Sequence, residues 1–238
     1  MPESKVALIT GAGKGVGRAT ALQLALAGYR VALVARTASD LDAVANQIAR
    51  QPNPPDTLAV PADLTDPAAP EQIVAVTLER FGRIDVLVNN AGVAVASPIA
   101  ETSPHDARRM VELNLLARIL LTRLVMPVMQ RHAAGVIVNL SSLAAFDPFP
   151  GFGVYAATQT AVNMLTRITA DEGRDHHITA VALALGAVET DLLRSLFDES
   201  FLPRDKTLDP ADVAAVIVDC VTGKRPFKSG ETIQLPSP

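Results

Sequence analysis

The chain has 238 residues, of which 49% are hydrophobic and 19% are charged, and its formal net charge is −4. This composition is typical of a soluble protein with a large core, and the charge gives no indication of nucleic-acid or anionic-membrane binding. The start "MPESKVALIT" has no apolar stretch behind a basic segment, so no signal peptide is predicted. The single cysteine, Cys220, excludes an internal disulfide and favours a reducing compartment, and we expect a cytoplasmic protein.

Short apolar runs alternate with longer helical patterns along the whole chain. The runs predict strands at residues 6–10, 30–35, 57–62, 85–90, 135–140, 178–185 and 232–235. Most of them lack polar alternation, which is typical of parallel strands covered on both faces. Helical patterns lie between them, at roughly 15–28, 38–50, 67–81, 104–132, 154–173 and 210–221. We therefore predict an α/β fold, a single Rossmann-like doubly wound parallel sheet of about seven strands flanked by helices, in one domain over 1–238.

The most apolar long segment is "MVELNLLARILLTRLVMPVMQ", which contains Glu112, Arg118 and Arg123. Charges at these positions make it a poor membrane span and favour a buried helix. The four histidines show no metal-ligand spacing, and no metal site is predicted.

A glycine-rich loop follows the first predicted strand, where sheets of this kind bind ligands. Its sequence "TGAGKGVG" fits the spacing T-G-x-x-x-G-x-G, whereas G-x-G-x-x-G fails because Val16 replaces the last glycine. Such a loop could be merely structural, but its position favours a turn that lets the backbone approach a pyrophosphate. The candidate contacts are Gly11, Gly13, Lys14, Gly15, Val16 and Gly17.

The end of the second predicted strand indicates which cofactor this loop serves. Dinucleotide folds commonly place an acid there to bind the ribose 2′-hydroxyl, but this chain has Ala35 and Arg36. A guanidinium can hold a 2′-phosphate through paired hydrogen bonds, and Lys14 adds positive charge on the same side. Both bases could instead be ordinary solvated residues. Without a competing acid, they favour NADP(H) over NAD(H).

The chain resembles the short-chain dehydrogenase/reductase family over nearly its whole length. The resemblance is carried by motifs in the family's order, namely "TGAGKGVG", "ADL" at 62–64, "NNAG" at 89–92, Asn114 in a long helix, "NLSS" at 139–142 and Tyr155. It implies that Asp63 faces the adenine amino group and that Leu64 lies beside the ring. Asp63 could instead cap the next helix. The resemblance also implies that the adenosine ribose is lined by Asn90, Ala91 and Gly92.

The resemblance further implies a catalytic group at Ser142, Tyr155 and Asn114. Ser142, thirteen positions before Tyr155, would orient a substrate carbonyl, and Tyr155 would donate or accept the proton. Asn114 would hold a water that connects the site to solvent, although it could be a buried residue satisfied by the backbone. Ser141 and Ser142 could both be turn residues, but only Ser142 has the matching separation from Tyr155.

The stretch "ALGAVETD" after the sixth predicted strand departs from the family's usual Pro-Gly, because Leu185 precedes Gly186. Proline would fix φ and stiffen the turn behind the nicotinamide, so we expect leucine to lower cofactor affinity modestly. Two residues that follow, Val188 and Thr190, match residues that contact the nicotinamide amide in the family.

A second departure is Gln159, one helical turn after Tyr155, where the family has a lysine. A lysine there would bond the nicotinamide ribose hydroxyls and lower the tyrosine pKa by its charge. Glutamine can supply a hydrogen bond but no charge. No lysine occurs between 154 and 173, and Arg167 lies two turns further on, so nothing nearby in sequence replaces it.

Two hypotheses follow. The first is an NADPH-dependent oxidoreductase that reduces a ketone or aldehyde of a small substrate, with weakened catalysis. Phe146, Phe149 and Phe152 favour an apolar substrate, but they would equally serve as lid packing. The second is a non-catalytic NADP(H)-binding sensor or inactive partner subunit. Residues 190–208 are expected to form a substrate lid, and the resemblance implies a homotetramer or homodimer built on the helices at 104–132 and 154–173.

Overall fold

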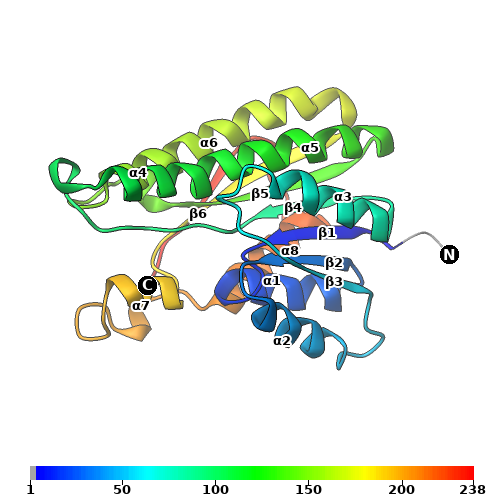
Figure 1. Cartoon of the computed structure of the whole chain (residues 1–238), viewed down its shortest axis with the longest axis horizontal. Coiled ribbons are helices and arrows are strands. Elements are labelled where there is room, and N and C mark those ends of the chain that lie inside the picture. The colour runs from blue at the N-terminus through cyan, green and yellow to red at the C-terminus, as the bar shows by residue number, and fades with distance from the viewer. Residues whose placement is uncertain (1–3) are drawn as a thin grey trace.

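The computed structural model describes residues 4–238, and its centre is one parallel sheet (Figure 1). The strand order is β3-β2-β1-β4-β5-β6-β7, and every neighbouring pair is parallel. The strands are β1 (Val6–Thr10), β2 (Arg30–Ala35), β3 (Thr57–Pro61), β4 (Val86–Asn89), β5 (Gly135–Ser142), β6 (Ile178–Leu185) and β7 (Thr232–Leu235). The chain runs outward from β1 in one direction and then from β4 in the other, so the strand order reverses between β1 and β4. The predicted doubly wound sheet is confirmed.

Helices cover both faces of the sheet (Figure 1). They are α1 (Gly15–Leu26), α2 (Ala38–Ile48), α3 (Ala69–Phe81), α4 (Pro104–Val111), α5 (Ala117–His132), α6 (Gly153–Gly173), α7 (Asp191–Leu196) and α8 (Pro210–Thr222). Helices α1, α2 and α8 lie on one face, α3, α5 and α6 lie on the other, and α7 stands beside the carboxyl ends of the strands. No helix within residues 4–238 combines the length and the apolarity that a membrane span requires.

The apolar core has two parts, one on each face of the sheet. In β1, Ala7 and Ile9 belong to the part under α1, α2 and α8, whereas Val6 and Leu8 belong to the opposite part. All four side chains are fully buried. Successive residues of a strand point to opposite faces, so a strand covered on both sides needs apolar residues throughout. This explains the unbroken apolar runs of the sequence.

The helix expected over 104–132 is interrupted by a π-helical turn over Glu112–Leu116, which lies between α4 and α5. Asn114, in the middle of this turn, is fully buried. Single π turns inside α-helices are frequent at functional sites. Strand β5 is two residues longer than expected and ends at Ser142, and α7 lies inside a segment for which no helix was predicted.

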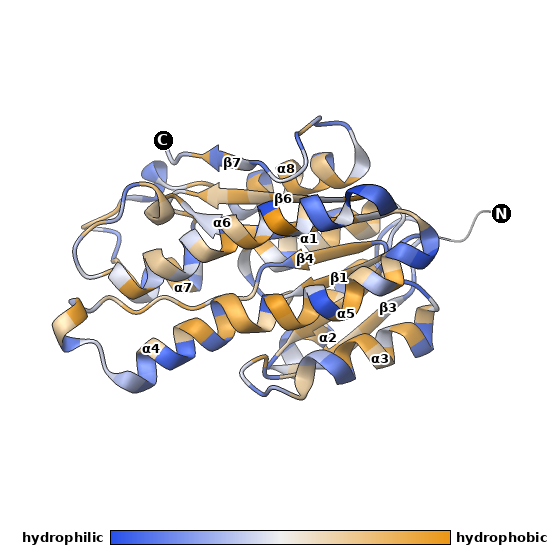
Figure 2. Ribbon diagram, turned by 90° about the horizontal axis from the view of Figure 1, so that it is seen from above, coloured by the Kyte–Doolittle hydropathy of each residue, from blue (hydrophilic) through white to orange (hydrophobic). Residues whose placement is uncertain are grey.

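An apolar surface lies on the outer side of α5, α6 and the preceding π turn. Figure 2 views this side and shows hydrophobic residues along both helices. Its large exposed members are Val111, Leu116, Ile119, Met164 and Ile168. Exposed hydrophobic residues that gather on neighbouring helices are typical of an interaction surface.

Candidate active site

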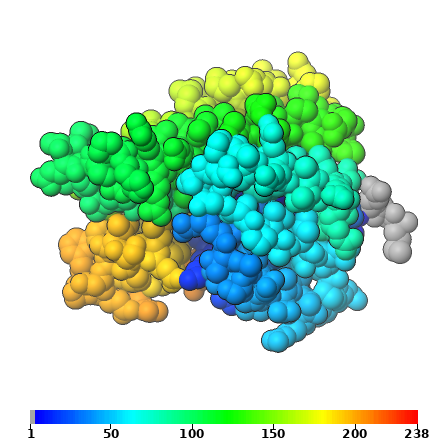
Figure 3. Space-filling model, viewed as in Figure 1, coloured from blue at the N-terminus to red at the C-terminus, as the bar shows by residue number. Residues whose placement is uncertain are grey.

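A large cavity of about 1720 Å³ lies beyond the carboxyl ends of the strands. Its walls come from the glycine-rich loop, the end of β2, the segment after β4, the end of β5, the start of α6 and residues 190–202, which we call the α7 segment. Figure 3 shows the surface hollowed between the α7 segment (orange) and the N-terminal part of the chain (blue). The cavity therefore lies where the strand order reverses, the usual place for a ligand in this class of sheet.

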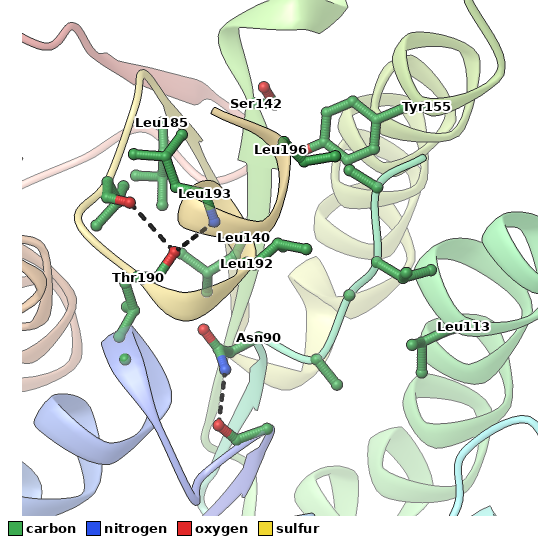
Figure 4. A pocket seen from close by; sticks show the side chains of 18 of the residues that line it. Asn90, Leu113, Leu140, Ser142, Tyr155, Leu185, Thr190, Leu192, Leu193 and Leu196 are labelled. Atoms are coloured by element: carbon green, nitrogen blue, oxygen red, sulfur yellow. Dashed lines mark hydrogen bonds between the residues drawn. The ribbon is translucent and has the colours of Figure 1, made fainter. Parts of the chain in front are cut away.

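The glycine-rich loop is held in place by close backbone contacts. Gly11 has a φ of +65°, and a Cβ atom at Gly17 would lie 2.2 Å from the Gly11 carbonyl oxygen, so neither position accepts a side chain. The Asn90 amide donates to the carbonyl oxygens of Thr10 at 2.9 Å and Gly11 at 3.2 Å (Figure 4). Asn90 thus fixes the loop through its side chain.

The N-terminus of α1 opens into the cavity without a capping side chain. Its N-cap residue, Lys14, makes no side-chain cap bond, and the first turn contains no acidic residue. The first N–H groups of a helix lack intrahelical partners and carry a partial positive charge. This end of the cavity therefore fits the diphosphate of a dinucleotide.

Basic residues flank the same end of the cavity. Lys14 Nζ lies 3.2 Å from a carboxylate oxygen of Asp191, and both side chains are largely exposed. Arg36 lies close enough to Asp63 to contribute to lowering its pKa, although the largest cause is the bond from the Thr65 backbone. Asp63 accepts this bond at 3.0 Å and one from the Thr65 hydroxyl at 2.8 Å. The carboxylate therefore stabilises a turn, not the N-terminus of α3.

Asn114 joins the segment after β4 to α6. Its amide oxygen accepts from the Val93 N–H at 2.8 Å, and its amide nitrogen donates to the Val93 carbonyl at 2.8 Å. The same nitrogen donates to the Thr158 hydroxyl at 3.2 Å, which in turn donates to the Tyr155 carbonyl at 2.7 Å. The side chain is thus satisfied mainly by backbone, as one of the two sequence-based alternatives expected.

Ser142 and Tyr155 lie near each other on the cavity wall (Figure 4), whereas the hydroxyl of the neighbouring Ser141 is bonded elsewhere. The Ser141 hydroxyl donates to the Gln159 carbonyl oxygen at 3.3 Å and is buried behind the strand. Ser142 also accepts a 3.1 Å bond from the Ala144 N–H, so it has a turn role as well. Alternation along β5 therefore gives a structural reason for choosing Ser142.

The environment of Tyr155 raises its pKa above the ordinary value of a tyrosine. The main cause is burial, while a hydrogen bond with Ser142 and the positive charge of Arg118 act in the opposite direction. Tyr155 is consequently protonated at neutral pH and can act as a proton donor there.

Arg118 was missed as a site residue by sequence reasoning, which treated it only as a charge that interrupts an apolar segment. It is 4% exposed, and it donates to the Leu140 carbonyl at 2.5 Å and to the Ala91 carbonyl at 3.2 Å. Burial lowers its pKa to about 10, so it is cationic at neutral pH. The signal that could have found it is its spacing of four residues from Asn114, which puts both side chains on one helix face.

Gln159 lines the cavity one helical turn after Tyr155 and is 3% exposed. Its backbone carbonyl accepts from Ser141, but its side-chain amide has no hydrogen-bond partner within residues 4–238. An amide without a protein partner at the wall of a cavity is available to a bound ligand.

The turn after β6 leads into α7 and caps its N-terminus. Val188 pairs with Leu208 in an isolated parallel bridge. Thr190 is the N-cap of α7, since its hydroxyl accepts from the Leu193 N–H at 3.2 Å and donates to the Val188 carbonyl at 3.2 Å (Figure 4). Its methyl group also lies 2.9 Å from the position of a Cβ atom at Gly15. Thr190 therefore packs directly against the glycine-rich loop.

Aromatic side chains form one part of the cavity wall. The ring centroids of Phe149 and Phe152 are 4.5 Å apart, and those of Phe152 and Phe197 are 5.8 Å apart. Phe197 stacks on Phe201 at 5.4 Å, and Phe152 meets the Tyr155 ring edge-on at 6.2 Å. This cluster joins the start of α6 to the α7 segment and makes the region beside Tyr155 apolar.

The family model described as short chain dehydrogenase matches residues 5–200, which is most of the chain and includes every site residue described above except those in the α7 segment beyond residue 200. The chain belongs to the short-chain dehydrogenase family. This result confirms the resemblance predicted from the motifs. It also makes the chain an oxidoreductase of this type, in a family that binds a nicotinamide cofactor.

Relatives of this short-chain dehydrogenase cover it almost completely. A 3-oxoacyl-[acyl-carrier-protein] reductase of Synechocystis sp. is 34% identical over 218 residues, which are 90% of this chain and 87% of that protein. The crystal structure of levodione reductase superposes with a TM-score of 0.91 at 28% identity, covering 98% of this chain and 96% of the other. A 3-ketoacyl-(acyl-carrier-protein) reductase from Brucella melitensis, complexed with NADH, gives 0.89 at 31% identity, covering 99% and 98%.

Proposed function

We propose that this short-chain dehydrogenase reduces the carbonyl group of a small apolar ketone or aldehyde with NADPH. The observation that carries the proposal is the juxtaposition of Ser142 with a protonated Tyr155 in the cavity that also receives the N-terminus of α1. The three relatives described above are all named as reductases, which supports this direction of reaction.

The cofactor supplies the hydride when it is bound, and the chain supplies the proton and the orientation of the carbonyl. Tyr155 donates its phenolic proton to the carbonyl oxygen as that oxygen becomes negative, and Ser142 polarises the same oxygen by a hydrogen bond. Asn114 links the segment after β4 to α6, because it accepts a hydrogen bond from Val93 and donates one to Thr158. Tyr155 is then protonated again from solvent.

The preference for NADPH rests on the end of β2. Arg36 and Lys14 offer two positive charges to a 2′-phosphate, and Ala35 leaves the usual position of a competing acid empty. Lys14 is paired with Asp191, but an exposed pair of this kind contributes only about 0–1 kcal/mol. Lys14 can therefore exchange this partner for a phosphate.

The remaining cofactor contacts are proposed from the family pattern and from their position on the cavity wall. Asp63 and Leu64 receive the adenine, and Val188 and Thr190 receive the nicotinamide amide. The segment over residues 90–92 borders the ribose, and the small residues there allow a close approach of the backbone. A Cβ atom at Gly92 would also lie 3.3 Å from the amide oxygen of Asn114.

The segment over 190–208 is proposed as the substrate lid of a chain with one domain, 1–238. It carries α7 and half of the aromatic cluster, and ion pairs of Glu189 with Arg194 and Arg204 hold its base. The apolar wall favours a substrate with an aliphatic or aromatic body beside the carbonyl. We propose a cytoplasmic location, which agrees with the lone buried Cys220.

We further propose a homotetramer or homodimer in which the apolar surface of α5 and α6 is the interface. Leu116 and Ile119 are 42% and 38% exposed, and Met164 and Ile168 on the neighbouring helix are 52% and 47% exposed. Burial of such side chains against a second copy is the simplest way to remove them from water.

A second candidate function is cofactor binding without turnover, as in a sensor or an inactive partner subunit. The observation in its favour is Gln159, which stands where the family pattern has a lysine and brings no charge to Tyr155. One experiment distinguishes the two functions. NADPH consumption is measured with a panel of ketones and aldehydes for the unchanged chain and for Tyr155→Phe, together with NADPH binding to both. Turnover that is lost in Tyr155→Phe supports the reductase, whereas binding without turnover in the unchanged chain supports the second function.

A further inference from the structure

We propose that Arg118 is a positioning residue for the reduction, because its buried guanidinium supplies from α5 the positive charge beside Tyr155 that Gln159 does not. This inference rests on the proposed function. In the family pattern a lysine of the tyrosine helix supplies this charge. Helix α6 carries no cation near Tyr155, so the charge comes from a residue of another helix.

The position of Arg118 is fixed by two carbonyl groups at the cavity wall. One belongs to Leu140, two residues before Ser142 on β5, and the other to Ala91 in the segment after β4. The guanidinium also lies 3.7 Å from the position of a Cβ atom at Gly92. Arg118 thus lies among the residues that line the cavity on the side of Ser142 and Tyr155.

The charge of Arg118 has no counter-ion in the part of the chain that the structure describes. Within residues 4–238 it makes no salt bridge, and its Nε atom is buried without a hydrogen-bond partner. Burying a cation without an anion is costly, and neutral donors would satisfy two carbonyl groups equally well. A retained charge at the wall of a cleft is therefore better explained by its effect on a neighbour that ionises.

Tyr155 is that neighbour. The other charged residues of the cavity wall come from the glycine-rich loop, the end of β2, α2, the segment after β3, α4, the π turn, the loop after β5 and α7. They are Lys14, Arg36, Asp40, Asp63, His105, Arg108, Arg109, Glu112, Asp147 and Asp191. Strands β5 and β6 contribute no charged residue, and the charged residues of α6 begin at Arg167. Arg118 is the charged group that acts on Tyr155: burial raises the pKa of the tyrosine, the positive charge of Arg118 lowers it, and Tyr155 in turn favours the charged form of Arg118.

The composition of the chain allows a direct test. There are two tyrosines and no tryptophan, so a Tyr29→Phe background leaves Tyr155 as the sole phenol in the ultraviolet titration. In this background, without cofactor, Arg118→Met is expected to move the Tyr155 titration to higher pH, and Arg118→Lys is expected to keep it near the original value. Arg123→Met, on the exposed side of the same helix, is the matched control and should change nothing.

A second experiment removes the positive charge from Arg118 on α5 and introduces one at position 159 on α6. Arg118→Met should lower kcat for carbonyl reduction at neutral pH at least about tenfold, which is part of the roughly 10²–10⁴-fold that a positioned acid contributes. Adding Gln159→Lys should then restore most of the rate and return the Tyr155 titration toward its original pH. The same Gln159→Lys change in the unchanged chain should bring little gain, because the charge is already present. This non-additivity is the signature of a shared role.

The outcomes separate the inference from the proposed function. If Arg118→Met does not fold, Arg118→Gln takes its place in the tyrosine titration and in the kinetic measurement. Its side-chain amide keeps hydrogen-bond donors for the two carbonyl groups. A folded neutral variant whose Tyr155 titration is unchanged overturns the proposal, even if activity falls. If the titration moves but the unchanged chain reduces no carbonyl compound, the role of Arg118 stands and the proposed function fails.

Discussion

Lys14 in the glycine-rich loop and Asp191 at the start of α7 form an ion pair whose nitrogen and oxygen atoms are 3.2 Å apart. The pair joins the proposed cofactor site to the proposed lid. Because Asp191 competes with a phosphate for Lys14, Asp191→Asn should tighten NADPH binding by a factor of about 2–5, the range of an exposed pair. Fluorescence titration with NADPH measures this change. NADH is the control, and an equal gain for both cofactors would show that Lys14 does not meet the 2′-phosphate.

Arg36→Ala should weaken NADPH binding by about 1.5–3 kcal/mol, the contribution of a charged hydrogen bond, and should leave NADH binding nearly unchanged. Isothermal titration of both cofactors with both variants checks the prediction. Arg50→Ala, an exposed arginine beyond the end of α2 that does not line the cavity, is the control. Equal affinity of the unchanged chain for NADPH and NADH would contradict the proposed preference.

The raised pKa of Tyr155 predicts opposite pH profiles for the two directions of reaction. Reduction needs the protonated phenol, which is the form present from neutral pH up to the raised pKa. Oxidation of an alcohol needs the phenolate as base, so its rate should climb well into the alkaline range. Initial rates in both directions across the alkaline range measure this, and Tyr155→Phe should lower both by about 10²–10⁴-fold. An oxidation rate that levels off near neutral pH would contradict the burial effect.

Gly17→Ala should destabilise the chain, because the new methyl group would lie 2.2 Å from the Gly11 carbonyl oxygen and the loop would have to shift. Overpacking of this kind costs about 1–3 kcal/mol and should also lower the affinity for NADPH. Thermal unfolding with and without NADPH provides both readouts. Gly28→Ala, which meets nothing within 4 Å, serves as the control. It should lower stability without changing NADPH affinity at a given temperature.

Ile119→Arg should convert the proposed oligomer into monomers, since it puts a charge in the middle of the apolar surface of α5 and α6. Light scattering at micromolar concentration measures the mass. Leu26→Arg, at an exposed apolar residue on the opposite layer, is the control and should leave the mass unchanged. A monomeric mass for the unchanged chain would exclude the interface.

The fold was predictable because its signals are local. The apolar runs of β1 and β2 indicate strands covered on both faces, and alternating helices then require parallel pairing. The π turn was not predictable, because the pattern around Asn114 is compatible with an unbroken α-helix and the extra residue appears only in the hydrogen bonds. Ser142 and Tyr155 were found through motif spacing, and their juxtaposition in the cavity agrees with it.

Arg118 was not found, because its role depends on contacts distant in sequence. Its partners Leu140 and Ala91 lie 22 and 27 positions away, so only the packing of α5 against the sheet brings the guanidinium to the cavity. The capping role of Thr190 could have been found, since threonine followed by aspartate before an apolar run is a typical start of a helix.

Thr190, just before α7, packs against the glycine-rich loop at Gly15, and Phe197, just after α7, stacks on Phe152 beside Tyr155. The same short segment therefore borders both the cofactor end and the substrate end of the cavity. This arrangement has a kinetic consequence. A dinucleotide bound at the loop contacts the residues that support the start of α7 before the second ligand binds. The two ligands are therefore expected to bind in a fixed order, in which the dinucleotide binds first and dissociates last. Product-inhibition patterns would then be competitive only between the oxidised and reduced dinucleotides.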